Sequence, residues 1–201
     1  SVSWELAVRV LGGLDLSLPT QAQWTHAARA GGDGRFCFGD DPGRLGDCAW
    51  YAANAKDGPR PVGLKATNGL GLHDVHGNVE EWVADWYGPY EAGEQVDPVG
   101  RSDGDFRVTR GGSHSTVPFY LRSANRMGTL PGDRTHLIGL RVALGPPPRT
   151  APLPPAAPER HARDVRQERL GEALLMYEAA ARSGEPVPGF VLENLRRQLG
   201  R

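Results

Sequence analysis

The sequence has little of what marks several large protein classes. No stretch approaches eighteen apolar residues, which excludes a transmembrane helix. The formal net charge of the 201 residues is −1, so the composition does not indicate a broad nucleic-acid-binding surface. No signal peptide is visible, and we expect a cytoplasmic protein. The chain opens at Ser1 without a methionine, as it would after removal of an upstream segment.

Cysteine is equally scarce. Cys37 and Cys48 are the only two, and the ten residues between them do not form a metal-ligand spacing. Reduced, packed thiols and a disulfide are the two alternatives, and we favour reduced thiols.

Two segments near the N-terminus carry helical signals. The apolar spacing from Trp4 to Leu11 predicts one amphipathic helix. Thr20 is a good N-cap with Gln23 as its capping-box partner, so a second helix is expected from there to the glycines at 31 and 32. The rest, up to Leu144, has short apolar runs separated by Gly, Asp, Asn and Pro, which are typical of loops and short strands. These features predict an α+β fold with two N-terminal helices and a loop-rich, short-stranded remainder.

The composition changes near position 145. Residues 145–158, GPPPRTAPLPPAAP, contain seven prolines in fourteen and predict a semi-rigid linker. Residues 159–201 predict a helical tail of two helices separated by GEPVPG. Such a tail needs a partner surface, which is either the main domain or another subunit.

Four stretches in residues 1–144 together carry a family resemblance. They are LPTQAQWTHAARAG, FGDDPGRLGDCAWYAANA, NGLGLHDVHGNVEEWVADWY and RVTRGGS…LRSANR…GLRVA. In this order and spacing they resemble the formylglycine-generating-enzyme, or sulfatase-modifying factor, family. The resemblance implies a C-type-lectin-like fold expanded by extra loops.

The segment HGNVEEW contains a candidate cation site. Asp74 and Glu81 flank a tight turn at Gly77 and Asn78, and carboxylates with turn carbonyls suit calcium. In the resembled family a calcium site lies here, and its ligands match the side chains of Asp74 and Glu81 and the carbonyls of Gly77 and Val79. The family has asparagine at position 74. The alternative is that both carboxylates cap loop amides or pair with arginine.

The family's oxidase chemistry does not carry over to this sequence. Its enzymes oxidise a substrate cysteine with copper held by two cysteines just after the GGS motif. The matching stretch here, GGSHSTVPFYLRSANR, contains no cysteine, and a copper–thiolate site needs soft sulfur ligands. His114 and His136 are metal-binding residue types, but two loop histidines do not make a site. We therefore expect no copper and no enzyme activity.

Residues 110–142 carry a more specific resemblance, to the variable region of diversity-generating-retroelement variable proteins. In those proteins a fixed frame, RGGS…P..LRSANR…P..R…IG[FL]RV, separates randomised clusters, and the frame is intact here. His114, directly after the GGS motif, is a departure from the relatives, which commonly carry tryptophan at this position. The resemblance implies a ligand-binding surface at thirteen positions: His114, Ser115, Thr116, Val117, Phe119, Tyr120, Met127, Gly128, Thr129, Leu130, Thr135, His136 and Leu137.

The residue types within the frame lead to three structural expectations. We expect the apolar variable residues on surface loops, with Phe119 and Tyr120 exposed as anchors. Ile138 and Leu140, in the closing strand, should face inward. The frame arginines should form structural bridges to Asp74, Asp85 or Asp105; they are Arg122, Arg126, Arg134 and Arg141.

The leading interpretation is a ligand-binding protein whose target is a protein or another macromolecule, because a flat, mixed surface suits such a partner. One alternative is a formylglycine-generating oxidoreductase or its inactive relative. Another is a structural module that the helical tail docks into an assembly.

Overall fold

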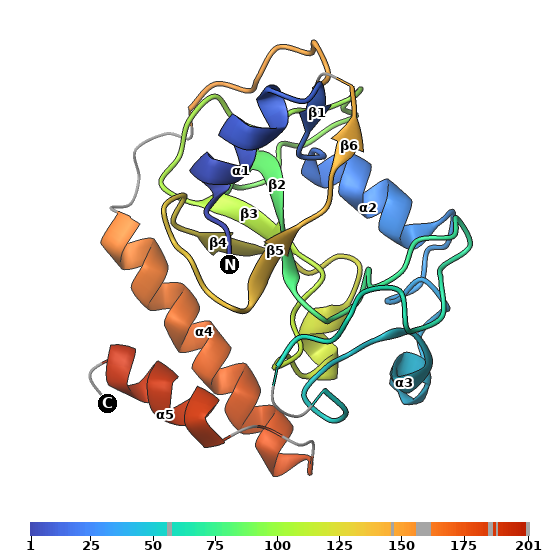
Figure 1. Ribbon diagram of the computed structural model, residues 1–201. Helices are drawn as coiled ribbons and strands as arrows, with labels where there is room; N and C mark the ends of the chain where they lie inside the picture. Colours follow the sequence, from blue (N-terminus) through green and yellow to red (C-terminus); the bar gives the residue numbers. More distant parts are fainter. Residues whose placement is uncertain (56–57, 146, 156–161, 185–186, 188, 200–201) are drawn as a thin grey trace. The chain divides into compact units, whose positions relative to one another are not determined.

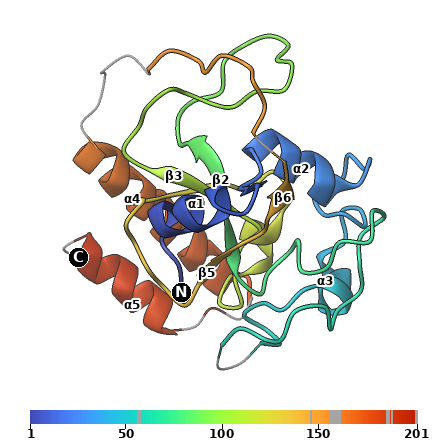
Figure 2. The same ribbon diagram turned by 45° about the horizontal axis from the view of Figure 1, so that its top comes forward.

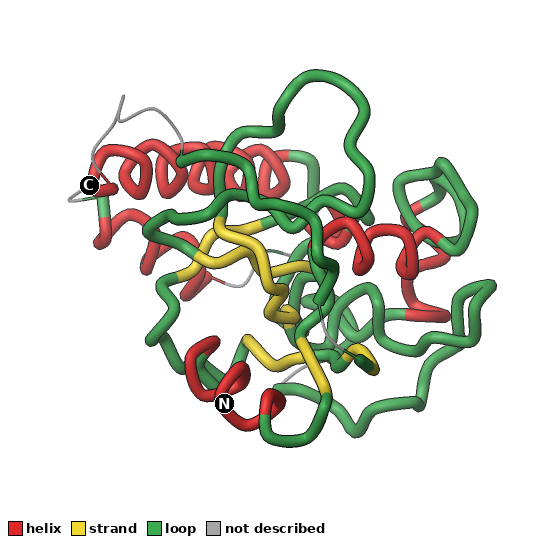
Figure 3. Tube along the Cα trace, turned by 90° about the horizontal axis from the view of Figure 1, so that it is seen from above, coloured by secondary structure: helices red, strands yellow, loops and turns green. Residues whose placement is uncertain are grey.

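The computed structural model describes residues 1–55, 58–145, 147–155, 162–184, 187 and 189–199. They form two compact units, residues 1–156 and residues 157–201, which we call the main domain and the helical unit. Loops make up much of the main domain (Figure 3). The mixture of helices, short strands and long loops confirms the predicted α+β class.

The two N-terminal helices form as the sequence predicts. Helix α1 spans Trp4–Gly12, and α2 spans Gln21–Arg29. The Thr20 hydroxyl accepts a hydrogen bond from the Gln23 N–H at 3.2 Å, and the Gln23 side chain accepts one from the Thr20 N–H at 2.9 Å. This capping box fixes the start of α2. The helix ends at Arg29, two residues before the first of the predicted glycines, because Ala30 already adopts the left-handed conformation with φ of 51°.

A four-stranded sheet with the order β4–β3–β2–β5 lies at the centre of the main domain (Figure 1). Its strands are β2 (Glu80–Trp86), β3 (Arg107–Arg110), β4 (Met127–Thr129) and β5 (Ile138–Leu140). Strand β3 is antiparallel to β2 and β4, and β5 is parallel to β2. A separate pair joins β1 (Leu16–Ser17) to β6 (Ala143–Leu144).

Strand β2 is buried on both faces. The side chain of Trp82 is fully buried and packs with Ala7 and Leu11 of α1, whereas Val83 packs with Trp24 of α2. Successive side chains of a strand point to opposite faces, so the two helices cover opposite sides of β2 (Figures 1 and 2). Trp82 therefore belongs to the core on the α1 side of the sheet.

Three short helical segments lie in the loops. They are a 3-10 turn η1 (Pro42–Arg44), helix α3 (Leu45–Cys48) and a second 3-10 turn η2 (Pro118–Leu121). Leu45, Cys48 and Leu121 belong to one buried cluster, so α3 and η2 pack together although they are distant in sequence.

Part of the predicted linker belongs to the main domain. The Leu153 N–H donates to the Gly100 carbonyl at 2.8 Å, and the Ser102 N–H donates to the Leu153 carbonyl at 2.9 Å. Arg101 also donates to the Pro154 carbonyl at 2.9 Å. Proline lacks an N–H, but Leu153 supplies one between two prolines, which allows this short backbone pairing.

The helical unit contains α4 (Ala162–Arg182) and α5 (Gly189–Gln198). Arg196 of α5 forms an ion pair with Glu178 of α4 at 2.7 Å. The two-helix prediction is thus confirmed, while its first residues, 159–161, lie outside the described part of the chain. None of the described helices has the length and apolar composition needed to cross a bilayer.

Candidate functional site

The turn after β3 positions the candidate surface. Gly111 and Gly112 have φ of 88° and 71°, in the region that favours glycine. A Cβ on Gly112 would lie 2.7 Å from the Leu121 Cδ2 atom, so a side chain does not fit there. The Ser113 N–H then donates to the Thr116 hydroxyl at 2.8 Å. The GGS motif is therefore a requirement of this turn.

Arg110 joins β3 to the later part of the frame. Its guanidinium is buried and donates to the backbone carbonyls of Ser123, Ala124 and Asn125, and to the Thr25 hydroxyl at 2.6 Å. Burial lowers the pKa of Arg110 to about 10, so the side chain stays charged at neutral pH. This side chain fixes the SAN segment against the sheet, which explains why both belong to one frame.

Three further frame arginines have structural contacts, but their predicted partners are wrong. Arg141 pairs with Glu81 at 2.8 Å, Arg126 donates to a backbone carbonyl after β2, and Arg122 donates to the carbonyl of Phe119. These contacts replace the expected pairs with Asp74, Asp85 or Asp105. Arg122 and Arg126 meet backbone carbonyls, which carry no sequence signal, and Arg141 meets a carboxylate 60 residues away, so residue types alone did not identify these partners.

Nine of the thirteen predicted variable positions are at least partly exposed. They lie on the loop after β3, on β4, and on the loop before β5: Ser115, Phe119, Met127, Gly128, Thr129, Leu130, Thr135, His136 and Leu137. The other four are buried: His114, Thr116, Val117 and Tyr120. Most variable positions therefore lie at the surface, and the four buried exceptions all belong to the first cluster, residues 114–120.

The buried positions of Val117 and Tyr120 correct the expectation that both face solvent. Side chains three residues apart lie on the same side of a 3-10 turn, and η2 directs these two inward. Phe119 lies on the other side of the turn and is 43% exposed. The Arg122 guanidinium lies 3.8 Å from the centre of the Phe119 ring. Phe119 is therefore the aromatic side chain that this cluster exposes.

Two histidines bring the first and third clusters together. The rings of His114 and His136 lie 5.5 Å apart between centroids. The His114 Nδ1 atom is 3.0 Å from the Ser115 hydroxyl. Burial, and then the charge of His136, lower the pKa of His114, so this ring is neutral at neutral pH.

The two residues of β5 that were expected to face inward are Ile138, which is buried, and Leu140, which is half-buried.

The predicted calcium ligands are arranged around an ion pair. Glu81 accepts hydrogen bonds from Arg141 through both oxygens and from the Trp24 indole at 2.6 Å. Asp74 accepts one from the Gly63 N–H at 2.8 Å. A cation here would meet the Arg141 guanidinium, so the residues as arranged do not fit calcium. Calcium binding by Asp74, Gly77, Val79 and Glu81 stays a prediction, and it requires Arg141 to leave Glu81.

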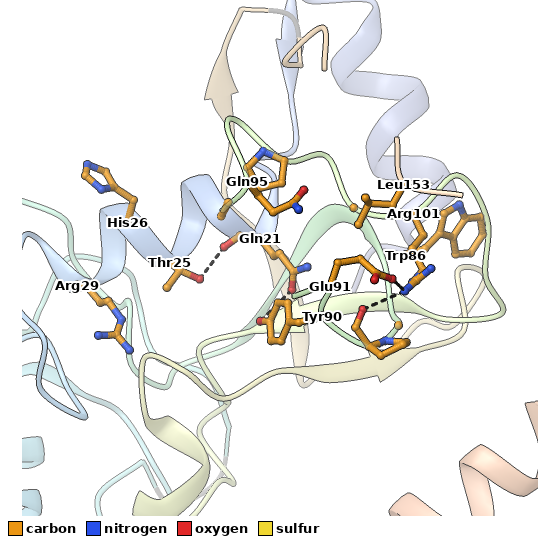
Figure 4. Close-up of a pocket in the computed structure, with 15 residues that line it drawn as sticks. Gln21, Thr25, His26, Arg29, Trp86, Tyr90, Glu91, Gln95, Arg101 and Leu153 are labelled. Carbon is orange, nitrogen blue, oxygen red and sulfur yellow. Dashed lines mark hydrogen bonds and ion pairs between the residues drawn. The ribbon is translucent and has the colours of Figure 1, made fainter. Parts of the chain in front are cut away.

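A separate cavity of about 340 Å³ opens between α2 and the loop after β2 (Figure 4). Gln21, Trp86, Tyr90 and Leu153 are among its lining residues, and the described lining includes none of the predicted variable positions. The Arg126 guanidinium lies 3.9 Å from the centre of the Tyr90 ring, which joins this cavity to the frame. The sequence signal that could have located this cavity is the aromatic cluster DWYGPY, residues 85–90, at the end of β2.

Together, the sheet, the two capping helices and the long loops define an α+β domain of the C-type-lectin-like type found in formylglycine-generating enzymes. Residues 2–145 match the family described as sulfatase-modifying factor enzyme 1-like domain. The chain belongs to this family.

Its relatives include enzymes and a variable protein. The formylglycine-generating enzyme of Streptomyces coelicolor is 36% identical over 159 residues, covering 71% of this chain and 51% of the relative. The solved structure of Treponema denticola variable protein 1 has 34% identity and a TM-score of 0.62, covering 65% of this chain and 48% of that one. PvdO from Pseudomonas aeruginosa has 28% identity and a TM-score of 0.60, with coverages of 70% and 59%. The chain spans about half the length of the formylglycine-generating enzyme it matches.

Proposed function

We propose that the chain is a ligand-binding variable protein, which displays a diversified surface on a C-type-lectin-like scaffold and is not catalytic. The division within residues 110–142 carries this proposal. Frame residues such as Arg110, Ser113 and Ser123 are buried and bonded, while most positions between them reach the surface. A rigid frame that presents loops of varied sequence follows the logic of an antibody paratope. The likeness to a variable protein of Treponema denticola supports this choice.

The chemistry of the surface suits a protein or another macromolecule. Phe119 and Leu130 are exposed apolar groups, and Thr129 and His136 are polar groups that also reach the surface. Aromatic and aliphatic anchors among polar groups are typical of protein interfaces.

Binding is tested with two sets of variants. We expect Phe119→Asp with Leu130→Asp to abolish capture of a macromolecular ligand from a cell lysate. Val62→Asp is the matched control, because Val62 is 78% exposed and lies outside the thirteen positions. Equal capture by both variants would place the binding surface elsewhere.

The flanking DNA gives an independent test. A diversified protein should lie near a reverse-transcriptase gene and a near-copy of codons 110–142 that differs mainly at adenines. An ordinary family member would lack both, and the proposal would then be wrong.

The second candidate function is the oxidase activity of the formylglycine-generating enzymes that the chain matches. It requires copper-dependent oxygen consumption with a cysteine-containing peptide. We expect none, because residues 110–142 contain no cysteine. Oxygen consumption that needs copper(I) would favour the enzyme instead.

A further inference from the structure

Cys37 and Cys48 lie on two elements that pack against Leu121, the last residue of η2. Cys37 lies in a tight turn. The Phe36 N–H donates to the Gly39 carbonyl at 3.0 Å, and the Gly39 N–H donates to the Phe36 carbonyl at 3.1 Å. Cys48 is the last residue of α3. Phe36, the neighbour of Cys37, belongs to the same buried cluster as Cys48, so the turn packs against α3, and both cysteines are free. Each thiol shifts the pKa of the other, with Cys48 as the hydrogen-bond donor.

The two thiols differ in accessibility and in acidity. Cys37 is half-buried, whereas Cys48 is 7% exposed. The hydrogen bond from Cys48, helped by His76, outweighs burial and lowers the pKa of Cys37 to about 5. The same bond and burial raise the pKa of Cys48. An accessible thiolate beside a protected thiol is the arrangement that thiol–disulfide exchange uses.

We propose that Cys37 and Cys48 form a thiol–disulfide exchange site, which closes into an intramolecular disulfide when it meets a small disulfide such as oxidised glutathione. Ten residues separate the two cysteines, so the bond would staple the turn at residues 36–39 to the end of α3.

The reaction balances in two steps. The Cys37 thiolate attacks one sulfur of the small disulfide, forming a mixed disulfide and releasing one thiolate. Cys48 then loses its proton to solvent and attacks the Cys37 sulfur, which releases the second thiolate. The chain, which starts with one thiolate and one thiol, loses two electrons and one proton overall. The small disulfide gains the two electrons and becomes one thiol and one thiolate, which solvent protonates according to pH.

The turn that would be stapled supports the frame. The Cys37 N–H donates to His76 Nε2 at 3.0 Å, and His76 Nδ1 donates to the Leu121 carbonyl at 2.7 Å. The Ser123 N–H donates to the Arg35 carbonyl at 2.7 Å. A disulfide would therefore stiffen the base under residues 114–121. The exchange site itself rests on these contacts and does not depend on the ligand-binding proposal.

The test combines oxidised glutathione, intact-mass measurement and two single variants of the full chain. We expect the parent chain to lose both free thiols and the mass of two hydrogens. Cys48→Ala should hold one glutathione on Cys37, because the second attack is missing. Cys37→Ala should stay unmodified, because Cys48 is protected by burial. Circular dichroism shows that each variant is folded, and Cys→Ser replaces any alanine variant that is not.

The pH dependence separates this site from an ordinary surface thiol. The rate for the parent chain should change little from about pH 6.5 to 8, where Cys37 is already a thiolate. In Cys48→Ala the rate should rise about tenfold per pH unit, because the pKa of Cys37 returns towards its usual value. A parent chain that keeps both thiols, or ends as a stable mixed disulfide, would overturn the proposal.

Discussion

Asp85 provides a test of the buried electrostatics around α2. Its carboxylate is 1% exposed and accepts a hydrogen bond from the Gln21 N–H at 2.7 Å through Oδ2. The other oxygen, Oδ1, is buried without a hydrogen-bond partner among the described residues. It faces Gly100, where a Cβ would come within 2.8 Å of it. Burial therefore outweighs the Gln21 hydrogen bond and raises the pKa of Asp85 to about 6.

The raised pKa determines the sign of the pH effect. The folded chain binds this proton more tightly than the unfolded chain, whose aspartate has a pKa of about 3.9. The stabilisation is therefore complete below about pH 4 and is lost as the pH rises through about 6. A difference of about two units corresponds to about 3 kcal/mol in the free energy of unfolding.

The perturbation is Asp85→Asn, which removes the titration and keeps an oxygen that can accept from Gln21. Urea unfolding of parent and variant is measured from about pH 4 to 8, and the difference between them cancels the other carboxylates. We expect the variant to gain up to about 3 kcal/mol on the parent across this range. Parallel stability curves would show that Asp85 titrates as an ordinary carboxylate and that its burial has been misjudged.

Four further substitutions have distinct expected effects on urea unfolding. Arg141→Met should lower the free energy of unfolding by about 3 kcal/mol, because Glu81 is left buried without its cation; a loss below about 1 kcal/mol would argue against the ion pair. Phe119→Ala should change it by less than about 0.5 kcal/mol, whereas Tyr120→Ala should cost about 3 kcal/mol, since only Tyr120 is buried. Equal losses would mean that η2 is oriented differently. Gly77→Ala should cost more than about 4 kcal/mol, because φ is 85° and the new Cβ would lie 2.1 Å from a backbone oxygen; a soluble variant with parental stability would contradict this turn.

The parts of the fold predicted correctly depend on local chemistry. The capping box of Thr20 and Gln23 acts within one helical turn, so the sequence locates the start of α2. The frame glycines are readable for the same reason, because their φ values serve a turn of a few residues.

The incorrect expectations concern contacts between distant segments or the direction of a short turn. Arg141 and Glu81 lie 60 residues apart, and composition does not show which carboxylate an arginine will meet. Leu153 joins the main domain through backbone bonds, to which its side chain gives no clue. Tyr120 and Phe119 are adjacent and both aromatic, and only the 3-10 geometry of η2 distinguishes their exposure.

The predicted calcium site at Asp74 and Glu81 can be tested by the effect of calcium on the Tm. Arg141 occupies the place of a cation beside Glu81, and Asp74 adds a second carboxylate close enough to affect the pKa of Glu81. A bound ion at a concentration of 100 Kd would stabilise the fold by about 2.7 kcal/mol. We expect millimolar calcium to leave the Tm of the parent chain equal to that in EDTA. In Arg141→Gln the two carboxylates lose their cation, and calcium should then raise the Tm. A rise of several degrees in the parent chain would mean that calcium displaces Arg141, and that the ligand set predicted from the sequence is correct.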